Sequence, residues 1–232
     1  LRGTVLHAAL ERYARGDWTG DPAAERARLM ACVEAALAEA APWPAARRLW
    51  AARLARVADW FVAGEARRRA EGAPALLETR MELDIAEIDF RLTAFADRID
   101  RLADGRVAIY DYKTGSPPTK KQQEHFDKQL LLEAMMVRAG ASETLGTPEV
   151  AKTVYIGLGS SPKEEATPID DALLAEVRDG FFRLIRSYDD PAQGYTARRA
   201  AESERFEGDY DHLSRFGEWD LSDAPDPQEV GR

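Results

Sequence analysis

Cysteine and net positive charge are both scarce in this chain of 232 residues, which has one cysteine, Cys32, and a formal net charge of −9. One thiolate cannot hold an iron–sulfur cluster that needs four cysteine ligands. Cys32 lies among alanines in a helical segment, and we interpret it as an inert core or half-buried residue. The acidic balance argues at first sight against a nucleic-acid partner, because phosphate contacts need lysine and arginine.

Long apolar runs are also missing. No stretch approaches the roughly 18 apolar residues that a membrane span needs, and no signal-peptide pattern opens the chain. Internal repeats and a glycine-rich phosphate loop are absent from the sequence as well. With 45% hydrophobic residues the chain can bury the core of one large domain, for which we expect no membrane partner. The start at Leu1, without an initiator methionine, leads us to expect a fragment of a longer chain.

The most informative pattern is Asp111-Tyr112-Lys113, which follows the largely apolar residues 106–110. This run predicts a strand, on which alternate side chains share a face, so Asp111 and Lys113 point one way and Tyr112 the other. A carboxylate there can hold a divalent cation, and a nearby amine can orient the water that attacks phosphorus. The pattern favours metal-dependent phosphodiester hydrolysis. The alternative is a strand end whose polar residues meet solvent before a turn.

A second acid precedes this strand. Residues 90–96 predict a strand that leads to Asp97, and residues 103–106 predict a turn into the strand that ends at Asp111. The two segments form a hairpin with one carboxylate near the end of each strand. Carboxylates on paired strands can share one hard cation, which prefers oxygen ligands.

Two helical patterns flank the hairpin. One opens at Gly3 and places His7 and Glu11 one turn apart on the same face. The other covers residues 122–139, where Gln129 lies beside an apolar stripe and can hydrogen-bond a phosphate or a carboxylate. The stripe is predicted to consist of Phe126, Leu130, Ala134 and Val137.

The order of these motifs resembles a known family. The motifs are Gly3-x-x-x-His7, Ala96-Asp97-Arg98-Ile99-Asp100, Asp111-Tyr112-Lys113-Thr114-Gly115 and Gln129-Leu130. Together they resemble the RecB-type branch of the PD-(D/E)XK nucleases, and most closely the carboxy-terminal nuclease domain of AddB-type subunits of bacterial helicase–nuclease complexes. The resemblance covers roughly residues 1–140 by motif, and four ordered motifs are more specific than any one of them.

The resemblance implies roles for individual residues. The metal side would consist of His7, Asp97, Asp111 and the backbone carbonyl of Tyr112. The catalytic set would consist of Asp97, Asp111, the lysine Lys113 and the organising glutamine Gln129. Asp97 is preferred to Asp100 because the family's acid directly follows the hydrophobic strand residue. Asp100 is then a loop or salt-bridge residue, although an exchange of these two roles stays open.

The chain departs from the family pattern in two places. Family members often carry a tyrosine four residues after the glutamine of the last motif, where this chain has Glu133. Many relatives also carry a four-cysteine iron–sulfur cluster, which the single Cys32 cannot form, so we expect a variant without a cluster. Residues 206–219 are interpreted as a latch that holds the carboxy terminus by aromatic packing.

The remaining patterns indicate an α/β fold of the restriction-endonuclease-like, PD-(D/E)XK type, with a central mixed sheet flanked by helices. Further strands are expected at residues 76–85 and 150–158, and helices at residues 22–41, 45–72 and 170–188. The second and third helices of the chain would form an α-helical insert after the first. We expect a nuclease domain over residues 1–199, with the insert at about 22–72, and a latch and tail over 200–232 whose end is disordered.

The function expected from these features is a Mg²⁺-dependent deoxyribonuclease, with Mn²⁺ as an alternative cation, that cuts single strands delivered by a helicase partner during double-strand break processing. Its partners would be single-stranded DNA or DNA ends and a helicase–nuclease subunit, in the bacterial cytoplasm at the nucleoid. Lysines gathered near the site, at positions 113, 120, 121 and 128, offset the overall acidity. A non-catalytic scaffold for DNA or a helicase subunit, and a stand-alone exonuclease, are the alternatives.

The arginines of residues 45–72 leave two interpretations open. They form a solvated helix face, or the insert lines a DNA path or docks the helicase partner.

Overall fold

The computed structural model describes residues 2–194, 212–213, 215, 217–219 and 222–224. The chain divides into two compact units, Leu1–Arg178 and Asp179–Arg232. The first unit contains the whole sheet and all the candidate site residues. Among the described residues, no helix combines the length and the apolar character needed to cross a membrane.

The elements of the structure follow the chain in this order: α1 (Arg2–Arg15), α2 (Pro22–Ala40), α3 (Pro44–Glu71), β1 (Gly72–Ile85), a 3₁₀ turn (Ala86–Ile88), β2 (Phe90–Leu102), β3 (Val107–Lys113), α4 (Lys120–His125), α5 (Gln129–Arg138), β4 (Val150–Gly157), β5 (Lys163–Pro168) and α6 (Asp171–Asp189). The strands form one sheet in the order β1-β2-β3-β4-β5. Only the β3/β4 pair is parallel, and the other three pairs are antiparallel. The sheet is therefore mixed, as the sequence predicts.

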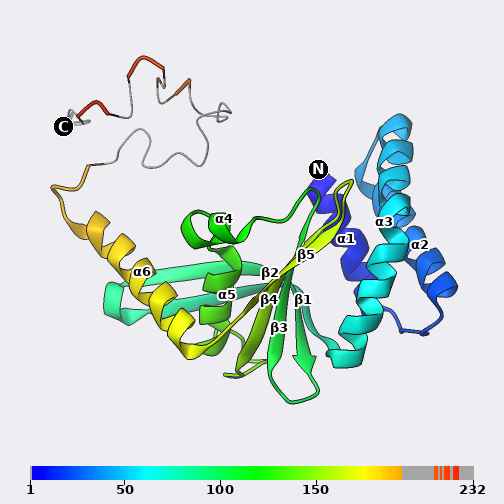
Figure 1. Cartoon of the computed structure of the whole chain (residues 1–232), viewed down its shortest axis with the longest axis horizontal. Coiled ribbons are helices and arrows are strands. Elements are labelled where there is room, and N and C mark those ends of the chain that lie inside the picture. Colours follow the sequence, from blue (N-terminus) through cyan, green and yellow to red (C-terminus); the bar gives the residue numbers. More distant parts are fainter. Residues whose placement is uncertain (1, 195–211, 214, 216, 220–221, 225–232) are drawn as a thin grey trace. The chain divides into compact units, whose positions relative to one another are not determined.

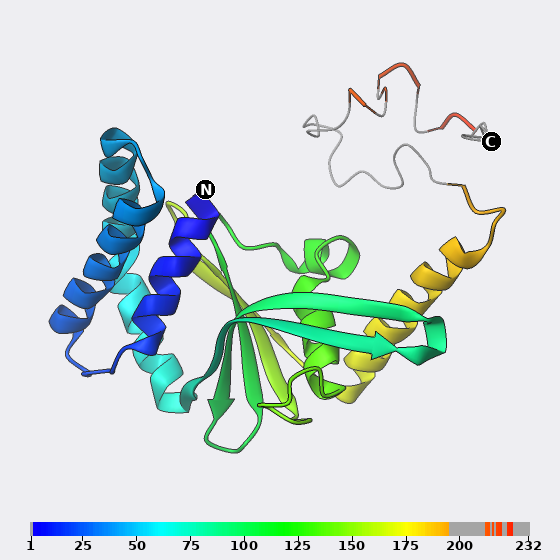
Figure 2. The same cartoon turned by 180° about the vertical axis from the view of Figure 1, so that it is seen from behind.

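Helices cover both faces of the sheet. Figures 1 and 2 show α1, α2 and α3 on one side of the sheet and α4 and α5 on the other. A parallel strand pair needs a crossover connection, which α4 and α5 supply between β3 and β4. The predicted restriction-endonuclease-like core, with a helical insert after the first helix, is confirmed.

Local signals in the sequence explain the insert. The Asp21 side chain accepts hydrogen bonds from the backbone of Ala23 and Ala24 and caps α2, and Pro22 takes the first helical position. Pro44 likewise opens α3, after an extended Trp43. A residue before proline is pushed out of the helical region, so the segment between α2 and α3 breaks what would otherwise be one long helix.

The main hydrophobic core lies between α1–α3 and strands β3 and β4. Tyr13 packs edge-on against Phe61, whose ring centroid lies 6.1 Å from that of Tyr112. Tyr112 therefore faces the insert, and by strand alternation its neighbours Asp111 and Lys113 face away from it.

A buried ionic network ties the insert to the sheet. Glu65 on α3 accepts hydrogen bonds from Arg98 on β2 at 2.7 Å and from Arg68 at 3.0 Å. Arg98 is fully buried, and its guanidinium also forms a two-pronged pair with Asp100 at 2.6 and 2.7 Å. Asp100 is thus a salt-bridge residue, but it lies within a strand rather than in a loop. Arg68 is buried as well, so the arginines of α3 do not all belong to a solvated face.

The sheet forks at the candidate site. Strand β2 pairs with β3 only from Arg98↔Tyr110 to Arg101↔Val107. Beyond Arg98 the long β1–β2 hairpin separates from β3, and Figure 2 shows it running across α5. The first positions past the last pair are Asp97 and Asp111, so both predicted acids lie at the fork.

Two sequence predictions are wrong, one strand was not predicted, and one prediction falls mostly outside the described residues. The single helix expected at residues 122–139 is wrong, because the chain leaves the helix at Phe126 and α5 begins at Gln129. Phe126, predicted to belong to the apolar stripe, is instead 45% exposed. Strand β5 was not predicted, and most of the proposed latch at residues 206–219 lies outside the described residues.

Candidate active site

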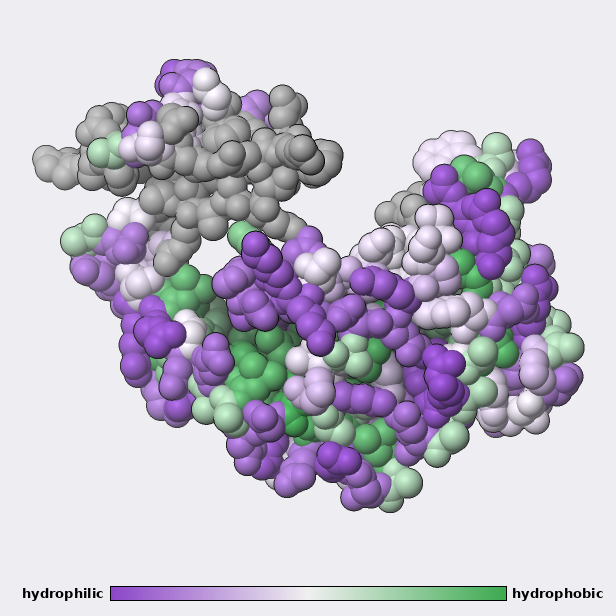
Figure 3. All heavy atoms as spheres, in the orientation of Figure 1, coloured by the Kyte–Doolittle hydropathy of each residue, from purple (hydrophilic) through white to green (hydrophobic). Residues whose placement is uncertain are grey.

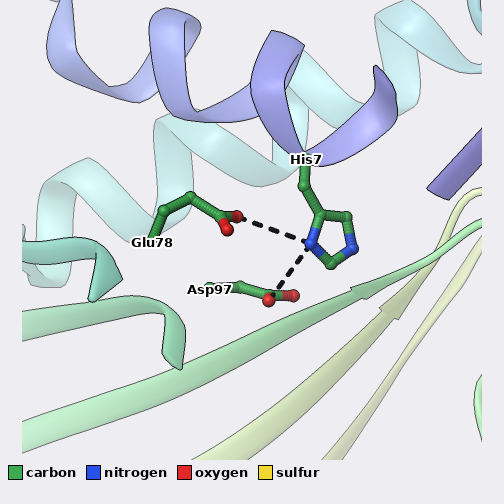
Figure 4. A group of neighbouring side chains, drawn as sticks. All are labelled: His7, Glu78 and Asp97. Atoms are coloured by element: carbon green, nitrogen blue, oxygen red, sulfur yellow. Dashed lines mark ion pairs between the residues drawn. The ribbon is translucent and has the colours of Figure 1, made fainter. Parts of the chain in front are cut away.

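Three side chains from three elements converge at the fork. His7 comes from α1, Glu78 from β1 and Asp97 from β2, and Figure 4 shows the two carboxylates pointing at one ring nitrogen of the histidine. The His7 Nδ1 atom lies 3.2 Å from Asp97 Oδ1 and 3.4 Å from Glu78 Oε1. One ligand atom from each residue lies within 4.8 Å of the others, which is the spacing of a metal-binding group.

The other ring nitrogen of His7 faces the backbone. Its Nε2 lies 3.0 Å from the carbonyl oxygen of Tyr112. Both nitrogens thus face oxygen atoms, and hydrogen bonds to Asp97 and Glu78 raise the pKa of His7 to about 10. The imidazolium places its positive charge between two carboxylates. To ligate a cation, His7 would have to give up the proton on the ligating nitrogen, because a metal-bound imidazole is neutral.

Asp97 joins the two strands of the fork. Its Oδ2 accepts a hydrogen bond of 2.8 Å from the backbone N–H of Tyr112, while its Oδ1 faces His7. The side chain is only 7% exposed, so its orientation is fixed from both sides. Through this bond the Asp97 carboxylate is held next to the backbone that carries Asp111.

Asp111 belongs to a second group of side chains. Lys113 Nζ donates to its Oδ1 at 3.1 Å, and Gln129 Nε2 donates to the same oxygen at 2.9 Å. Lys113 Nζ also donates to Gln129 Oε1 at 3.2 Å. The predicted Asp111, Lys113 and Gln129 therefore contact one another, although they come from a strand and a crossover helix.

The second oxygen of Asp111 is not fully satisfied. Asp111 Oδ2 is buried and accepts no hydrogen bond from the described residues, although Lys113 Nζ lies 3.0 Å away. The ammonium still attracts this oxygen, because charge attraction at this distance does not need hydrogen-bond geometry. Burial, together with the charge of Asp97, raises the pKa of Asp111. A cation bound at this oxygen would offset that cost.

The sequence analysis did not assign two acids to the site: Glu78 was not singled out, and Glu133 was named only as a departure from the family pattern. Glu78 faces Asp97 across the hairpin, a relation that depends on the β1/β2 register and has no local signal. Glu133 is 2% exposed and accepts a hydrogen bond of 3.1 Å from Gln129. Burial raises its pKa to about 8. The helical spacing from Gln129 to Glu133 is the signal that could have placed Glu133 here.

The residues present fit a hard divalent cation. Carboxylate and carbonyl oxygens, which make up most of the donor set, are ligands that suit Mg²⁺ and Mn²⁺. The structure places His7, Glu78, Asp97 and the Tyr112 carbonyl in one group, and Asp111, Lys113, Gln129 and Glu133 in another. The two groups adjoin through the hydrogen bond from Tyr112 to Asp97.

Several known proteins are similar in sequence to part of this chain. An uncharacterized protein of Rickettsia felis is 31% identical over 126 residues, which cover 53% of this chain and 14% of the relative. An uncharacterized protein of Rickettsia conorii is 32% identical over 94 residues, covering 39% of this chain and 11% of the relative. The chain therefore spans only a small part of the length of these relatives.

A solved structure titled "Crystal structure of SSO0001" aligns with 82% of this chain and 96% of its own, at 15% identity and a TM-score of 0.33, a likeness too low to carry an argument. The family comparison is more extensive. A family model described as the PD-(D/E)XK nuclease superfamily matches residues 1–217, which contain every residue of both groups. The chain belongs to the PD-(D/E)XK nuclease superfamily.

Proposed function

We propose that this chain is a Mg²⁺-dependent nuclease domain that hydrolyses phosphodiester bonds of single-stranded DNA. The observation that carries the proposal is the fork itself, where two strands deliver Asp97 and Asp111 side by side and Lys113 reaches Asp111. Two carboxylates and an amine at one fork of the sheet are the groups that cation-assisted hydrolysis of a phosphodiester needs.

The residues divide the work according to their positions. Asp97, Asp111, Glu78 and His7 would hold the cation, together with the Tyr112 carbonyl. A bound Mg²⁺ would lower the pKa of a water ligand and offset charge on the phosphate. Lys113, whose side chain is 32% exposed, can hold the attacking water or a phosphate oxygen through its Nζ. Gln129 keeps Lys113 and Asp111 together.

The biological setting forms part of the same proposal. Membership of the nuclease superfamily supports DNA as substrate, and the resemblance to AddB-type domains supports a helicase partner in double-strand break repair. The matched relatives are far longer than the matched region, which is compatible with a nuclease module inside a larger protein. A partner that supplies most of the DNA-binding affinity would also explain how a domain with a net charge of −9 acts on DNA.

The test is cleavage of end-labelled single-stranded DNA by the unchanged protein and by Asp111→Ala and Lys113→Ala. We expect cleavage with Mg²⁺ or Mn²⁺, no cleavage with a chelator, and loss of at least about 100-fold in either variant, because both act on the transition state. Circular dichroism would check that each variant is folded.

Asp104→Ala is the matched control. Asp104 is an exposed acid in the turn between β2 and β3, where it pairs with Arg106. Its loss should leave cleavage unchanged. Full activity in Asp111→Ala would refute the proposed centre. A folded protein that binds Mn²⁺ and DNA but cuts no strand, alone or with a helicase partner, would instead identify a scaffold.

A further inference from the structure

Glu133 is a buried acid at a place where stability alone would favour an apolar residue. It lies one turn after Gln129 on α5, among helix residues that are mostly buried and apolar. Its Oε1 accepts a hydrogen bond from Gln129, and its Oε2 has no hydrogen-bond partner among the described residues. Burying a carboxyl group with one oxygen unsatisfied costs free energy. Such a cost is expected where the buried group contributes to the function of the site.

The hydrogen bonds of the Gln129 amide indicate what Glu133 contributes. An amide has two N–H donors and one acceptor oxygen. Nε2 donates to Asp111 Oδ1 at 2.9 Å and to Glu133 Oε1 at 3.1 Å, while Oε1 accepts from Lys113 Nζ at 3.2 Å. Every polar position of the amide is therefore used. The Asp111 carboxylate and the Lys113 ammonium fix the orientation of the Gln129 amide, with its nitrogen toward Asp111 and its oxygen toward Lys113. Glu133 accepts from the second N–H of that nitrogen.

This second acceptor matters because packing does not hold Gln129. Its side chain is exposed at the start of α5, in contrast to the buried Glu133 one turn later. An exposed side chain has several rotamers, and its ordering has an entropic cost. The hydrogen bond to the buried Glu133 restricts the rotamers of the Gln129 side chain, even when Asp111 and Lys113 move. Without Glu133, one amide N–H would turn to water.

We propose that Glu133 is a positioning residue, which acts through Gln129 to hold the Asp111 carboxylate and the Lys113 amine in the geometry needed for cation binding and hydrolysis. The inference rests on the proposed function and deepens it. Hydrogen-bond partners behind a metal ligand typically contribute about 10- to 100-fold to metal affinity or activity. Glu133 contacts the proposed ligand Asp111 only through Gln129, so an effect at the lower end of that range is expected.

Two substitutions distinguish the effect of the hydrogen bond between Glu133 and Gln129 from the effect of the size of the side chain at position 133. Glu133→Gln retains an oxygen that can accept from Gln129, whereas Glu133→Leu has similar size and no acceptor. Mn²⁺ binding is measured by calorimetry without DNA, and kcat and KM are measured with end-labelled single-stranded DNA. For Glu133→Leu we expect about 10-fold weaker Mn²⁺ binding, a similar fall in kcat and an unchanged KM. Glu133→Gln should resemble the unchanged protein in all three.

Thermal unfolding distinguishes positioning from a structural role. Because Glu133→Leu removes an unsatisfied buried carboxyl group, its Tm should be equal or higher even though its Mn²⁺ affinity falls. In a Gln129→Leu background, Glu133→Leu should add no further loss of Mn²⁺ affinity, since the two residues act in series.

Unchanged Mn²⁺ affinity in Glu133→Leu would overturn the inference. So would an equal loss of Mn²⁺ affinity in Glu133→Gln. A third contradicting result is that Glu133→Leu lowers Mn²⁺ affinity as much in the Gln129→Leu background as in the unchanged protein. Absence of any Mn²⁺ binding by the unchanged protein would overturn it together with the proposed function. If the unchanged protein binds Mn²⁺ but does not cut DNA, only the proposed nuclease function fails, because the calorimetric comparison still decides whether Glu133 positions Asp111.

Discussion

Glu78 adopts a backbone conformation that L-residues rarely occupy, with φ of 44° in the middle of strand β1. The left-handed region costs a non-glycine residue roughly 1–2 kcal/mol. Strain of this kind collects at functional sites, where the surrounding structure enforces it. At Glu78 it accompanies a side chain that faces His7 Nδ1 beside Asp97.

Glu78→Gly should therefore separate stability from cation binding. We expect the free energy of unfolding to rise by about 1 kcal/mol, because glycine accepts a positive φ, and Mn²⁺ affinity to fall at least about 10-fold. Urea unfolding and calorimetry measure the two quantities. Glu82→Gly is the matched control on the same strand, where φ is not positive; it should lose about 1 kcal/mol and retain Mn²⁺ affinity. Equal destabilisation in both variants would refute the strain argument.

Single residues also mark the limit of what the sequence predicts about the site. Asp111 and Lys113 could be paired by strand alternation alone, and the structure places them in contact. Glu78 could not be identified, because its place opposite Asp97 depends on pairing between two strands. Glu133 was noticed only as a departure from the family pattern. The helical spacing puts Glu133 beside Gln129, but its burial depends on how α5 packs against β3 and β4, which has no local signal.

At the scale of elements, apolar patterns predict α1–α3 and β3 well, because each of them contributes buried side chains to the main core. Strand β5 lacks such a signal, since its residues Lys163–Pro168 are largely polar and it lies at the edge of the sheet. The break between α4 and α5 depends on a tertiary contact as well. There the Tyr155 hydroxyl donates to Asp127 at 2.5 Å, in the segment between the two helices.

The ionic network between α3 and β2 makes a prediction about acid stability. Burial opposes the ionisation of Glu65, but the charges of Arg98 and Arg68 outweigh it and lower the pKa of Glu65 to about 2. A carboxyl group with a lowered pKa in the folded state stabilises the fold above its ordinary pKa of 4.5, and this contribution disappears as the pH falls toward 2. The contribution is about 3 kcal/mol.

Glu65→Gln should remove that pH dependence. Urea unfolding followed by circular dichroism at pH 7, 4.5 and 3 should show a smaller loss of stability on acidification in Glu65→Gln than in the unchanged protein. The variant should already be less stable at pH 7, because Arg98 and Arg68 lose their shared partner. Glu39→Gln removes an exposed acid paired with Arg12 and should follow the unchanged protein. The same acid sensitivity in Glu65→Gln and the unchanged protein would contradict the prediction.

At the scale of the whole molecule, charge is unevenly distributed. The net charge is −9, yet Lys120 and Lys121 open α4 and are exposed. Figure 3 shows hydrophilic side chains gathered over α4. Helix α4 belongs to the crossover that also leads to Gln129, so we predict that these lysines contact phosphates of the DNA proposed as substrate.

Reversal of both charges, in Lys120→Glu/Lys121→Glu, should weaken binding of single-stranded DNA. If each lysine contacts one phosphate, the slope of log affinity against log salt concentration should fall in magnitude by about 1.4. Fluorescence anisotropy with a chelator present measures binding without cleavage. Mn²⁺ affinity should not change. The control, Lys152→Glu/Arg106→Glu, makes the same change of charge near the other end of strands β3 and β4 and should retain the original slope. Equal slopes in the two variants would exclude α4 from the DNA path.

The bond between His7 and the Tyr112 carbonyl joins positions 105 apart in the chain. By contrast, Asp97 accepts from the Tyr112 backbone over a separation of 15, and Asp111, Lys113, Gln129 and Glu133 form hydrogen bonds over separations of 2 to 18. Closing the longer loop costs roughly 2 kcal/mol more entropy than closing one of the shorter ones. During folding, the hairpin and crossover can thus bring the carboxylates together before α1 docks. The acids would then repel each other until His7 or a metal ion arrives, so Mn²⁺ in the refolding buffer should speed the appearance of the native state.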